Sequence, residues 1–304
     1  MSNKISKISK IEIKSLWGRF DLTWHLQPDV NILSGINGSG KSTILDCIAV
    51  LLSTATLPSG LGKLLQSLKI VFDNGKYIAL KRVGNATNLI SLDKLGITLN
   101  EFHNLIKIDI ISTFDNMIPK DVEYPDKNVK TELDKYIFDL QKKYLDYQLN
   151  VGKKVFEAVT QNNGRSQEDV LNIKKQQERF IEIIDNLFKD TDKKIDRKKN
   201  EIVFLSGNDE ISAYQLSSGE KQILIILLTV LVQDNMPSII LMDEPEISLH
   251  FDWQKKLIQY VRELNPNTQI ILATHSPAII MEGWRDKVFD VRDLTTFDNQ
   301  KSKK

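Results

Sequence analysis

The stretch Gly35-Ile-Asn-Gly-Ser-Gly-Lys41-Ser42 constrains the fold more than any other part of the chain, because it fits the pattern G-x-x-x-x-G-K-[ST]. An apolar run, Val30–Leu33, precedes it, and an apolar stretch that suits a helix, Thr43–Leu52, follows. Glycines let backbone N–H groups turn inward on a polyphosphate, and the helix adds its positive N-terminal end. We therefore expect phosphate to bind this loop through Gly35, Asn37, Gly38, Ser39, Gly40, Lys41, Ser42 and Thr43.

Charged and hydroxyl side chains have separate expected roles at such a site: phosphate binding, metal coordination and activation of water. Lys41 reaches the β- and γ-phosphates, and the Ser42 hydroxyl completes the coordination of Mg²⁺. A second apolar strand, Ser238–Met242, ends in Asp243 and Glu244. Because consecutive side chains point to opposite faces of a strand, these acids have different expected roles. Asp243 would hold the metal through water, and Glu244 would orient the attacking water. A buried strand with a polar end explains the apolar run but not both acids.

Two more motifs flank the paired acids. Leu216-Ser-Ser-Gly-Glu220 opens an apolar helix, and by itself it is an N-cap with an early glutamate. Beside the other motifs, Ser217 and Gly219 predict a second anion-binding helix start, which one triphosphate can share with the first only if two chains face each other. His275 follows the strand Gln269–Ala273 and predicts a contact to the γ-phosphate; the alternative is a structural hydrogen-bonding histidine.

These four motifs, in this order, resemble the head of ABC-type ATPases. Three features point away from membrane transporters. The sequence Pro-Glu-Ile-Ser-Leu-His250 follows the acids where transporter subunits have Leu-Asp, a helical insertion separates the two halves, and nothing suggests coupling to a membrane domain. The chain is similar to the SMC/RecF/OLD-like branch, and more narrowly to small bacterial AAA-family ATP-binding proteins of the anti-phage-defence type.

The resemblance implies a head-to-head homodimer, or a higher oligomer, that sandwiches two ATP molecules with Mg²⁺. One chain would contribute Ser217 and Gly219, Ser248 would sit at the seam, and the other chain would contribute Lys41, Ser42, Asp243, Glu244 and His275. Two positions depart from the family pattern. Its usual glutamine is not evident, and Asp115 or Asn116 would replace it near the metal; Ser218 stands where many members have glycine. Arg19, after the first strand, is a further candidate nucleotide contact.

The fold class that follows is α/β: a P-loop NTPase of the ABC ATPase head type with a mixed sheet, an N-terminal antiparallel β lobe and an inserted helical hairpin. We expect three parts: 1–128 with the P-loop and β lobe, 129–199 with the hairpin, and 200–304 with the other motifs. The β lobe would hold two strands around a turn in 8–33 and a hairpin in 69–83. Beyond residue 200 the pattern predicts β-α-β-α-β, in which Ile202–Leu205 and Glu210–Tyr214 flank a Ser-Gly-Asn-Asp turn.

The insertion has the spacing of a packed helix. Up to about Lys199 it has no proline, and apolar residues recur every three or four positions at Leu133, Ile137, Leu140, Tyr144, Tyr147 and Val151. Asn162-Asn163-Gly164 breaks the pattern before it resumes, which predicts an antiparallel hairpin. Two interpretations stay open: a helical subdomain with a solvated charged face, or an arm that grips a partner.

Composition excludes several classes. Lysine and arginine (41) balance aspartate and glutamate (40), which argues against a nucleic-acid-coating protein whose surface is basic throughout. The single cysteine, Cys47, excludes an intrachain disulfide and a zinc ribbon, and the lack of Cys-x-x-Cys in the insertion excludes a zinc hook. The longest apolar run, Ile223–Val232, is ten residues and too short to span a bilayer. We expect a cytoplasmic protein with no membrane contact.

The first functional hypothesis is an ATP-driven switch or scaffold in anti-phage defence: ATP closes the dimer, hydrolysis reopens it, and a partner effector responds. The chain ends 29 residues after His275, which leaves no room for an OLD-type nuclease domain, so a nuclease or toxin is expected on a partner encoded nearby. The alternative is a RecF-type repair ATPase that binds DNA through Lys193, Lys194, Arg197, Lys198 and Lys199, unless these residues are a solvated helix end. The third hypothesis is the ATPase subunit of a membrane transporter. The trigger and the effector stay open.

Overall fold

The chain forms two compact units. The computed structural model describes residues 5–53, 63–83, 86–91, 99–112, 116–118, 124–160 and 167–297. The first unit comprises Met1–Ser112, Met236–Pro245 and Asn267–Lys304, and the second comprises Thr113–Asn235 and Glu246–Pro266. The P-loop, the paired acids and His275 therefore belong to the first unit, whereas Ser217 and Gly219 belong to the second.

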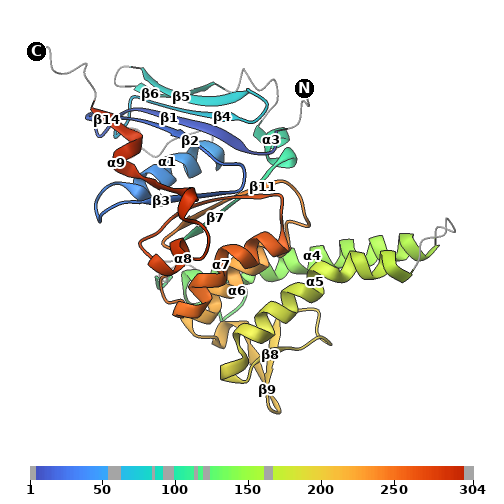
Figure 1. Cartoon of the computed structure of the whole chain (residues 1–304). Coiled ribbons are helices and arrows are strands. Elements are labelled where there is room, and N and C mark those ends of the chain that lie inside the picture. Colours follow the sequence, from blue (N-terminus) through green and yellow to red (C-terminus); the bar gives the residue numbers. More distant parts are fainter. Residues whose placement is uncertain are drawn as a thin grey trace, which may run out of the picture. The chain divides into compact units, whose positions relative to one another are not determined.

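A five-stranded parallel sheet organises the first unit (Figure 1). Its strand order is β13 (Val288–Asp290), β3 (Val30–Ser34), β12 (Thr268–Ala273), β11 (Ser238–Asp243) and β7 (Lys107–Ser112). Side chains of β3, β11 and β12 are buried almost throughout, as expected for parallel strands that are covered on both faces. The parallel sheet predicted from the apolar strands is confirmed for β11 and β12.

A six-stranded antiparallel sheet forms the rest of the β structure in this unit. Its order is β14 (Thr295–Phe297), β2 (Phe20–His25), β1 (Ile8–Leu16), β4 (Ser67–Phe72), β5 (Tyr77–Val83) and β6 (Ala86–Ser91). The predicted β4–β5 hairpin is confirmed. Residues 8–33 hold three strands rather than the two predicted, because β2 also alternates, with Leu22 and Trp24 buried between outward polar side chains.

Helix α1 (Lys41–Ser53) lies between the two sheets of the first unit (Figure 1). Its Ile48 and Leu52 join Ile11 and Ile70 of the antiparallel sheet and Leu241 of the parallel sheet in one apolar core. This packing holds the helix start in place at the end of β3. Among its described residues, the unit also has three shorter helices: α3 (Leu99–Leu105), α8 (Pro277–Met281) and α9 (Val291–Leu294).

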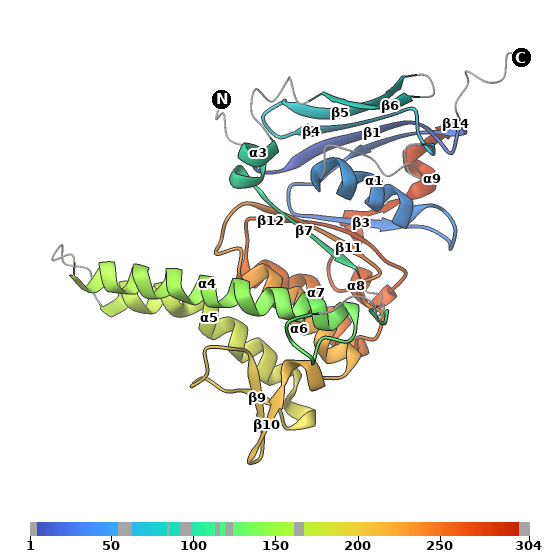
Figure 2. The same cartoon turned by 180° about the vertical axis from the view of Figure 1, so that it is seen from behind.

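The second unit is mainly helical. Helices α4 (Glu132–Thr160) and α5 (Gln167–Leu187) form the predicted antiparallel hairpin (Figure 2), which we call the arm. All six residues of the predicted seam are buried: Leu133, Ile137, Leu140, Tyr144, Tyr147 and Val151. Helices α6 (Ser218–Leu231) and α7 (Phe251–Leu264) pack with the base of the arm.

A small antiparallel sheet, β10 (Asp209–Ser212), β9 (Val203–Ser206) and β8 (Lys194–Ile195), completes the second unit. The predicted turn Ser206-Gly-Asn-Asp209 is confirmed, but the strands on either side of it pair with each other, so β9 is not part of the parallel sheet. Its partner β10 follows after a two-residue turn in which Gly207 has a φ of +58°, so the chain folds back on itself. Within the described part of the chain, no helix is both long and apolar enough to cross a membrane.

Candidate nucleotide site

Three strands of the parallel sheet end side by side. Ala273, the last residue of β12, pairs with Leu33 of β3 on one side and with Asp243 of β11 on the other. Because these strands are parallel, the P-loop, Glu244 and His275 all leave the sheet at the same edge. There a cavity of about 510 Å³ is lined by Trp17, Asn37, Gly38, Gly40, Lys41, Ser42, Thr43, Glu244 and His275.

Lys41 directs its ammonium group at three acceptors around this cavity. Its Nζ lies 3.1 Å from the carbonyl oxygen of Gly35, 3.4 Å from that of Ile36 and 2.6 Å from Nε2 of His275. An ammonium group only donates, so Nε2 of His275 is the acceptor in this contact. A cation from α1 and a ring nitrogen from the end of β12 thus meet at one point.

Trp17 lines the same cavity, and no sequence motif pointed to it. A Cβ atom added to Gly40 would lie 1.9 Å from Cη2 of the Trp17 ring, and Gly40 has a φ of +97°. Only glycine fits at this position. Trp17 itself has a φ of +51°, which is rare for a bulky side chain, and such backbone strain clusters at functional sites. The aromatic ring therefore forms one wall of the phosphate loop.

Glu244 adopts a strained backbone conformation at the end of β11. Its φ is +46°, and its backbone N–H donates to the carbonyl oxygen of Ala273 at 2.8 Å. Its Oε1 lies 3.6 Å from Nε2 of His275, and both side chains are about one-third exposed. The left-handed turn directs this carboxylate into the cavity beside His275 and Lys41. A carboxylate in this place can polarise a water molecule close to a bound phosphate.

Oxygen groups suited to Mg²⁺ gather at the start of α1. Ser42 is exposed in the first turn, and Asp46 follows one turn later. Partial burial, and then the nearby carboxylate of Asp243, raise the pKa of Asp46. Hydroxyl and carboxylate oxygens are the ligands that Mg²⁺ prefers, and it commonly uses one or two carboxylates together with substrate phosphates. Ser42 and Asp243 therefore fit a magnesium ion that arrives with a nucleotide.

In the second unit, Ser217 caps the start of α6. Its Oγ accepts from the backbone N–H of Glu220 at 3.4 Å and donates to Oε2 of the same residue at 2.9 Å. Gly219 lies against the segment that follows Pro245, because a Cβ there would be 2.2 Å from the carbonyl oxygen of Ser248. Ser248 has a φ of +67° and is exposed. The tight backbone contact therefore joins Gly219, two residues after the exposed Ser217, to the exposed Ser248.

The carboxylate of Glu220 is held by several donors. Lys193 Nζ lies 2.7 Å from Oε1, and the hydroxyl of Thr191 donates to the same oxygen at 3.0 Å. Burial alone would raise the pKa of Glu220, but these donors and Ser217 together lower it. The negative charge at this helix start is thus balanced within the unit, so it repels an approaching anion less.

Two protein-family models match the chain. One, described as "AAA ATPase domain", matches residues 7–163, and the other, described as "AAA domain, putative AbiEii toxin, Type IV TA system", matches residues 98–282. Each spans more than half of the chain. The chain belongs to the AAA ATPase family. This agrees with the resemblance stated from the four motifs.

Relatives of this AAA ATPase include two bacterial proteins. The chain is 29% identical over 146 residues to the Retron Vc95 probable ATPase of Vibrio cholerae serotype O1 biovar El Tor, which covers 44% of this chain and 28% of that protein. It is 25% identical over 303 residues to the Septu protein PtuA of Bacillus thuringiensis, with 90% and 72% covered. The chain thus spans less than a third of the first relative.

Among solved structures, the Smc head bound to the C-winged helix domain of ScpA is similar to this AAA ATPase. The TM-score is 0.60 at 17% identity, over 97% of this chain and 98% of that chain. At this identity the likeness shows the fold alone. The predicted fold class, an α/β P-loop NTPase head with mixed sheets and an inserted helical hairpin, is confirmed.

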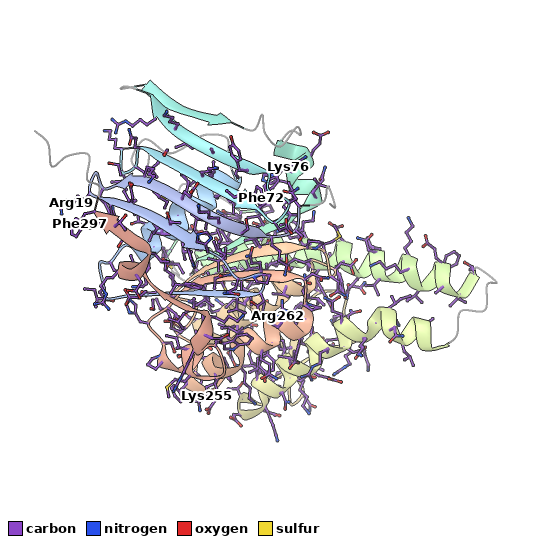
Figure 3. The ribbon with its side chains drawn as sticks, turned by 45° about the horizontal axis from the view of Figure 1, so that its top comes forward. Arg19, Phe72, Lys76, Lys255, Arg262 and Phe297 are labelled. Carbon is purple, nitrogen blue, oxygen red and sulfur yellow. The ribbon has the colours of Figure 1, made fainter. Side chains whose placement is uncertain are left out.

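Other predicted residues of this AAA ATPase lie elsewhere. Arg19 is exposed at the edge of the six-stranded sheet beside Phe297 (Figure 3), and among the described residues the cavity lining includes Trp17 of the same turn but not Arg19. Asn116 is exposed, and its carbonyl oxygen accepts from the N–H of Glu132 at 2.9 Å. Asp115 lies outside the described residues.

The basic cluster proposed for DNA is largely paired within the second unit. Lys193, Arg197 and Lys199 lie 2.7, 3.1 and 3.0 Å from the carboxylates of Glu220, Asp185 and Glu210. Phosphate contacts by these three residues would compete with existing ion pairs. This observation favours the alternative given for the cluster, a solvated helix end and turn.

Proposed function

We propose that this AAA ATPase binds and hydrolyses ATP with Mg²⁺ at the P-loop cavity. The observation that carries the proposal is the convergence of Lys41, Glu244 and His275 at one sheet edge, through the registers of β3, β12 and β11. Lys41 would neutralise the β- and γ-phosphates, Glu244 would orient the attacking water, and His275 would contact the γ-phosphate. Ser42 and Asp243 would hold Mg²⁺, which would offset the charge that develops on the phosphates.

We further propose that ATP closes a homodimer. Ser217 and Gly219 lie in a different unit from the P-loop, at the start of a helix whose dipole favours anions. A second copy would offer this helix start to the γ-phosphate bound by the first, with Ser248 at the seam. Hydrolysis would remove the shared anion and allow the dimer to open.

The biological role we propose is a switch or scaffold for an effector protein, a nuclease or toxin encoded nearby, in anti-phage defence inside the cytoplasm. The names of the relatives support this role, since one is a Septu protein and another is a retron ATPase. Direct binding of DNA is the outcome that would redirect the proposal toward repair. The ion pairs of the basic cluster do not favour it.

The Glu244→Gln variant tests this function. It keeps the shape of the side chain and removes the base, so ATP should bind and trap a dimer that light scattering detects. Lys41→Ala is the matched control and should neither bind ATP nor dimerise with it. A Glu244→Gln protein whose mass is unchanged by ATP would contradict the sandwich, and near-normal turnover by Lys41→Ala would contradict the site. ATP hydrolysis measured with and without DNA separates the effector switch from the repair ATPase.

A further inference from the structure

The outward face of α4, near the tip of the arm, carries an apolar stripe that the arm does not bury. Leu149, Phe156 and Val159 are 72%, 68% and 68% exposed, while Tyr147 and Val151, on another face of the same helix, are buried in the seam. Together with Gly152, the stripe recurs at intervals of three and four residues, the spacing of one helix face. A second apolar face on a helix that already packs against α5 indicates a second contact.

Gly152 occupies the middle of this stripe. A glycine inside a helix is unfavourable relative to alanine, and here a Cβ would meet nothing within 4 Å. No contact within the described part of the chain therefore requires glycine at this position. A shallow position between two large exposed side chains suits the close approach of another large side chain from outside.

The stripe is complementary to itself when two copies run antiparallel. If the twofold axis lies between Asn150 and Val151, Leu149 of each copy faces Gly152 of the other. In the same register, Phe156 faces Leu145, a half-buried residue on the same side of α4 that lines a hollow with Val203 and Tyr214. Large side chains thus meet small or medium ones, as interdigitating helices require.

The charges along one flank of the stripe favour the same antiparallel orientation. In chain order they are Lys142, Asp146, Lys153 and Glu157, with alternating sign. An antiparallel pair brings Lys142 near Glu157 and Asp146 near Lys153, with these pairs centred one residue from the axis of the apolar contacts, whereas a parallel arrangement in register would place like charges together. Among the described residues, neither Asp146 nor Lys153 forms an ion pair.

We propose that this face of α4 docks on the same face of a second copy of the chain, as an antiparallel helix pair. The contact needs no nucleotide and is separate from the proposed ATP-dependent dimer. Each copy would then have two different twofold contacts, one at the head and one at the arm, and ATP would join arm-paired dimers into larger assemblies.

Sedimentation of the full chain without nucleotide tests the proposal. Wild type should sediment as a dimer and Phe156→Glu as a monomer with unchanged helix content by circular dichroism. Leu171→Glu is the matched control, because Leu171 is also 68% exposed but lies on α5 outside the stripe, and it should stay dimeric. A wild-type protein that is monomeric without nucleotide at every concentration, or a Phe156→Glu protein that stays dimeric, would overturn the proposal.

A charge exchange tests the antiparallel register. Asp146→Lys and Lys153→Asp each replace two opposite-charge contacts with two like-charge contacts, so each should weaken its own dimer by about tenfold. An equimolar mixture of the two variants restores opposite charges at both contacts and should regain the affinity of wild type. If the mixture dimerises no better than either variant alone, the register is wrong. Because the experiment contains no ATP, its failure leaves the proposed ATPase function untouched.

Discussion

Lys221 of α6 and Asp134 of α4 form an ion pair in the interior of the second unit, with 2.7 Å between Nζ and Oδ1 and side chains only 11% and 4% exposed. The other carboxylate oxygen of Asp134 accepts from the backbone N–H groups of Lys130 and Thr131. One residue thus caps the arm helix and anchors α6, the helix that Ser217 caps. Since Glu220 is tied to Lys193 beyond α5, both ends of the arm are bound to the first turn of α6.

Breaking this pair should destabilise the protein strongly. Asp134→Asn keeps the size of the side chain but leaves the Lys221 charge buried without a counter-charge, which typically costs about 3–5 kcal/mol. Denaturant unfolding should report this loss. The double variant with Lys221→Met should recover much of it. The exposed pair of Lys154 and Asp234 provides the control, since Lys154→Met should cost less than about 1 kcal/mol. Equal losses at both sites would contradict the buried pair.

Trp17 should report nucleotide binding. Its ring contacts Gly40 of the P-loop, so a bound polyphosphate changes its surroundings, whereas Trp24 is 0% exposed and far less sensitive. We expect ATP to change tryptophan fluorescence in wild type and in Glu244→Gln. The change should be lost in Lys41→Ala and largely lost in Trp17→Phe. A full response in Trp17→Phe would show that the signal arises elsewhere.

Gly219→Ala should separate dimer closure from nucleotide binding. Its Cβ would be 2.2 Å from the carbonyl oxygen of Ser248, so the start of α6 must shift, at a cost of about 1–3 kcal/mol. ATP should still bind, since the P-loop belongs to the other unit. In the Glu244→Gln background, however, the ATP-trapped dimer should be lost. Ser218 is the exposed neighbour of Gly219, and Ser218→Ala is the matched control that should keep the dimer. Loss of ATP binding by Gly219→Ala would contradict the prediction that this residue acts in dimer closure alone.

Cys47 should make stability fall at high pH. Burial, and then the neighbouring carboxylate of Asp46, raise the pKa of this thiol from 9.0 to about 12. Above pH 9 the unfolded chain therefore loses the proton while the folded chain keeps it, so stability falls by about 1.4 kcal/mol per pH unit until pH 12. Relative to Cys47→Ala, wild type should lose stability between about pH 8 and about pH 10. A constant difference between the two proteins over that range would contradict the raised pKa.

Local signals were sufficient for several elements. The β4–β5 hairpin follows from Asn74-Gly75, because the turn residues by themselves specify how the chain reverses. The seam of α4 follows from its three- and four-residue spacing, since helix periodicity is independent of the partner. The strand, loop and helix around Lys41 follow from one continuous segment.

Other features depend on which distant segments meet. The turn Ser206-Gly-Asn-Asp209 indicates that the chain reverses between β9 and β10, but no local pattern shows that these strands pair with β8 rather than with the parallel sheet. Trp17 reaches Gly40 only because the β1–β2 turn belongs to the sheet that covers α1. Arg19, two residues later in that turn, was the predicted contact, but neighbours in a turn point in different directions.

The motifs by themselves therefore predicted the groups of the candidate site: a glycine-rich loop with Lys41 and Ser42, paired acids after an apolar strand, and a histidine after the next. Only the tertiary structure decided that β12 lies between β3 and β11, which brings Lys41, Glu244 and His275 to one cavity. The same holds for the burial of Asp134 with Lys221 and for the exposure of the stripe on α4. The physical reason is that residue type sets what a group can bind, whereas burial and strand order, which are non-local, set what it meets.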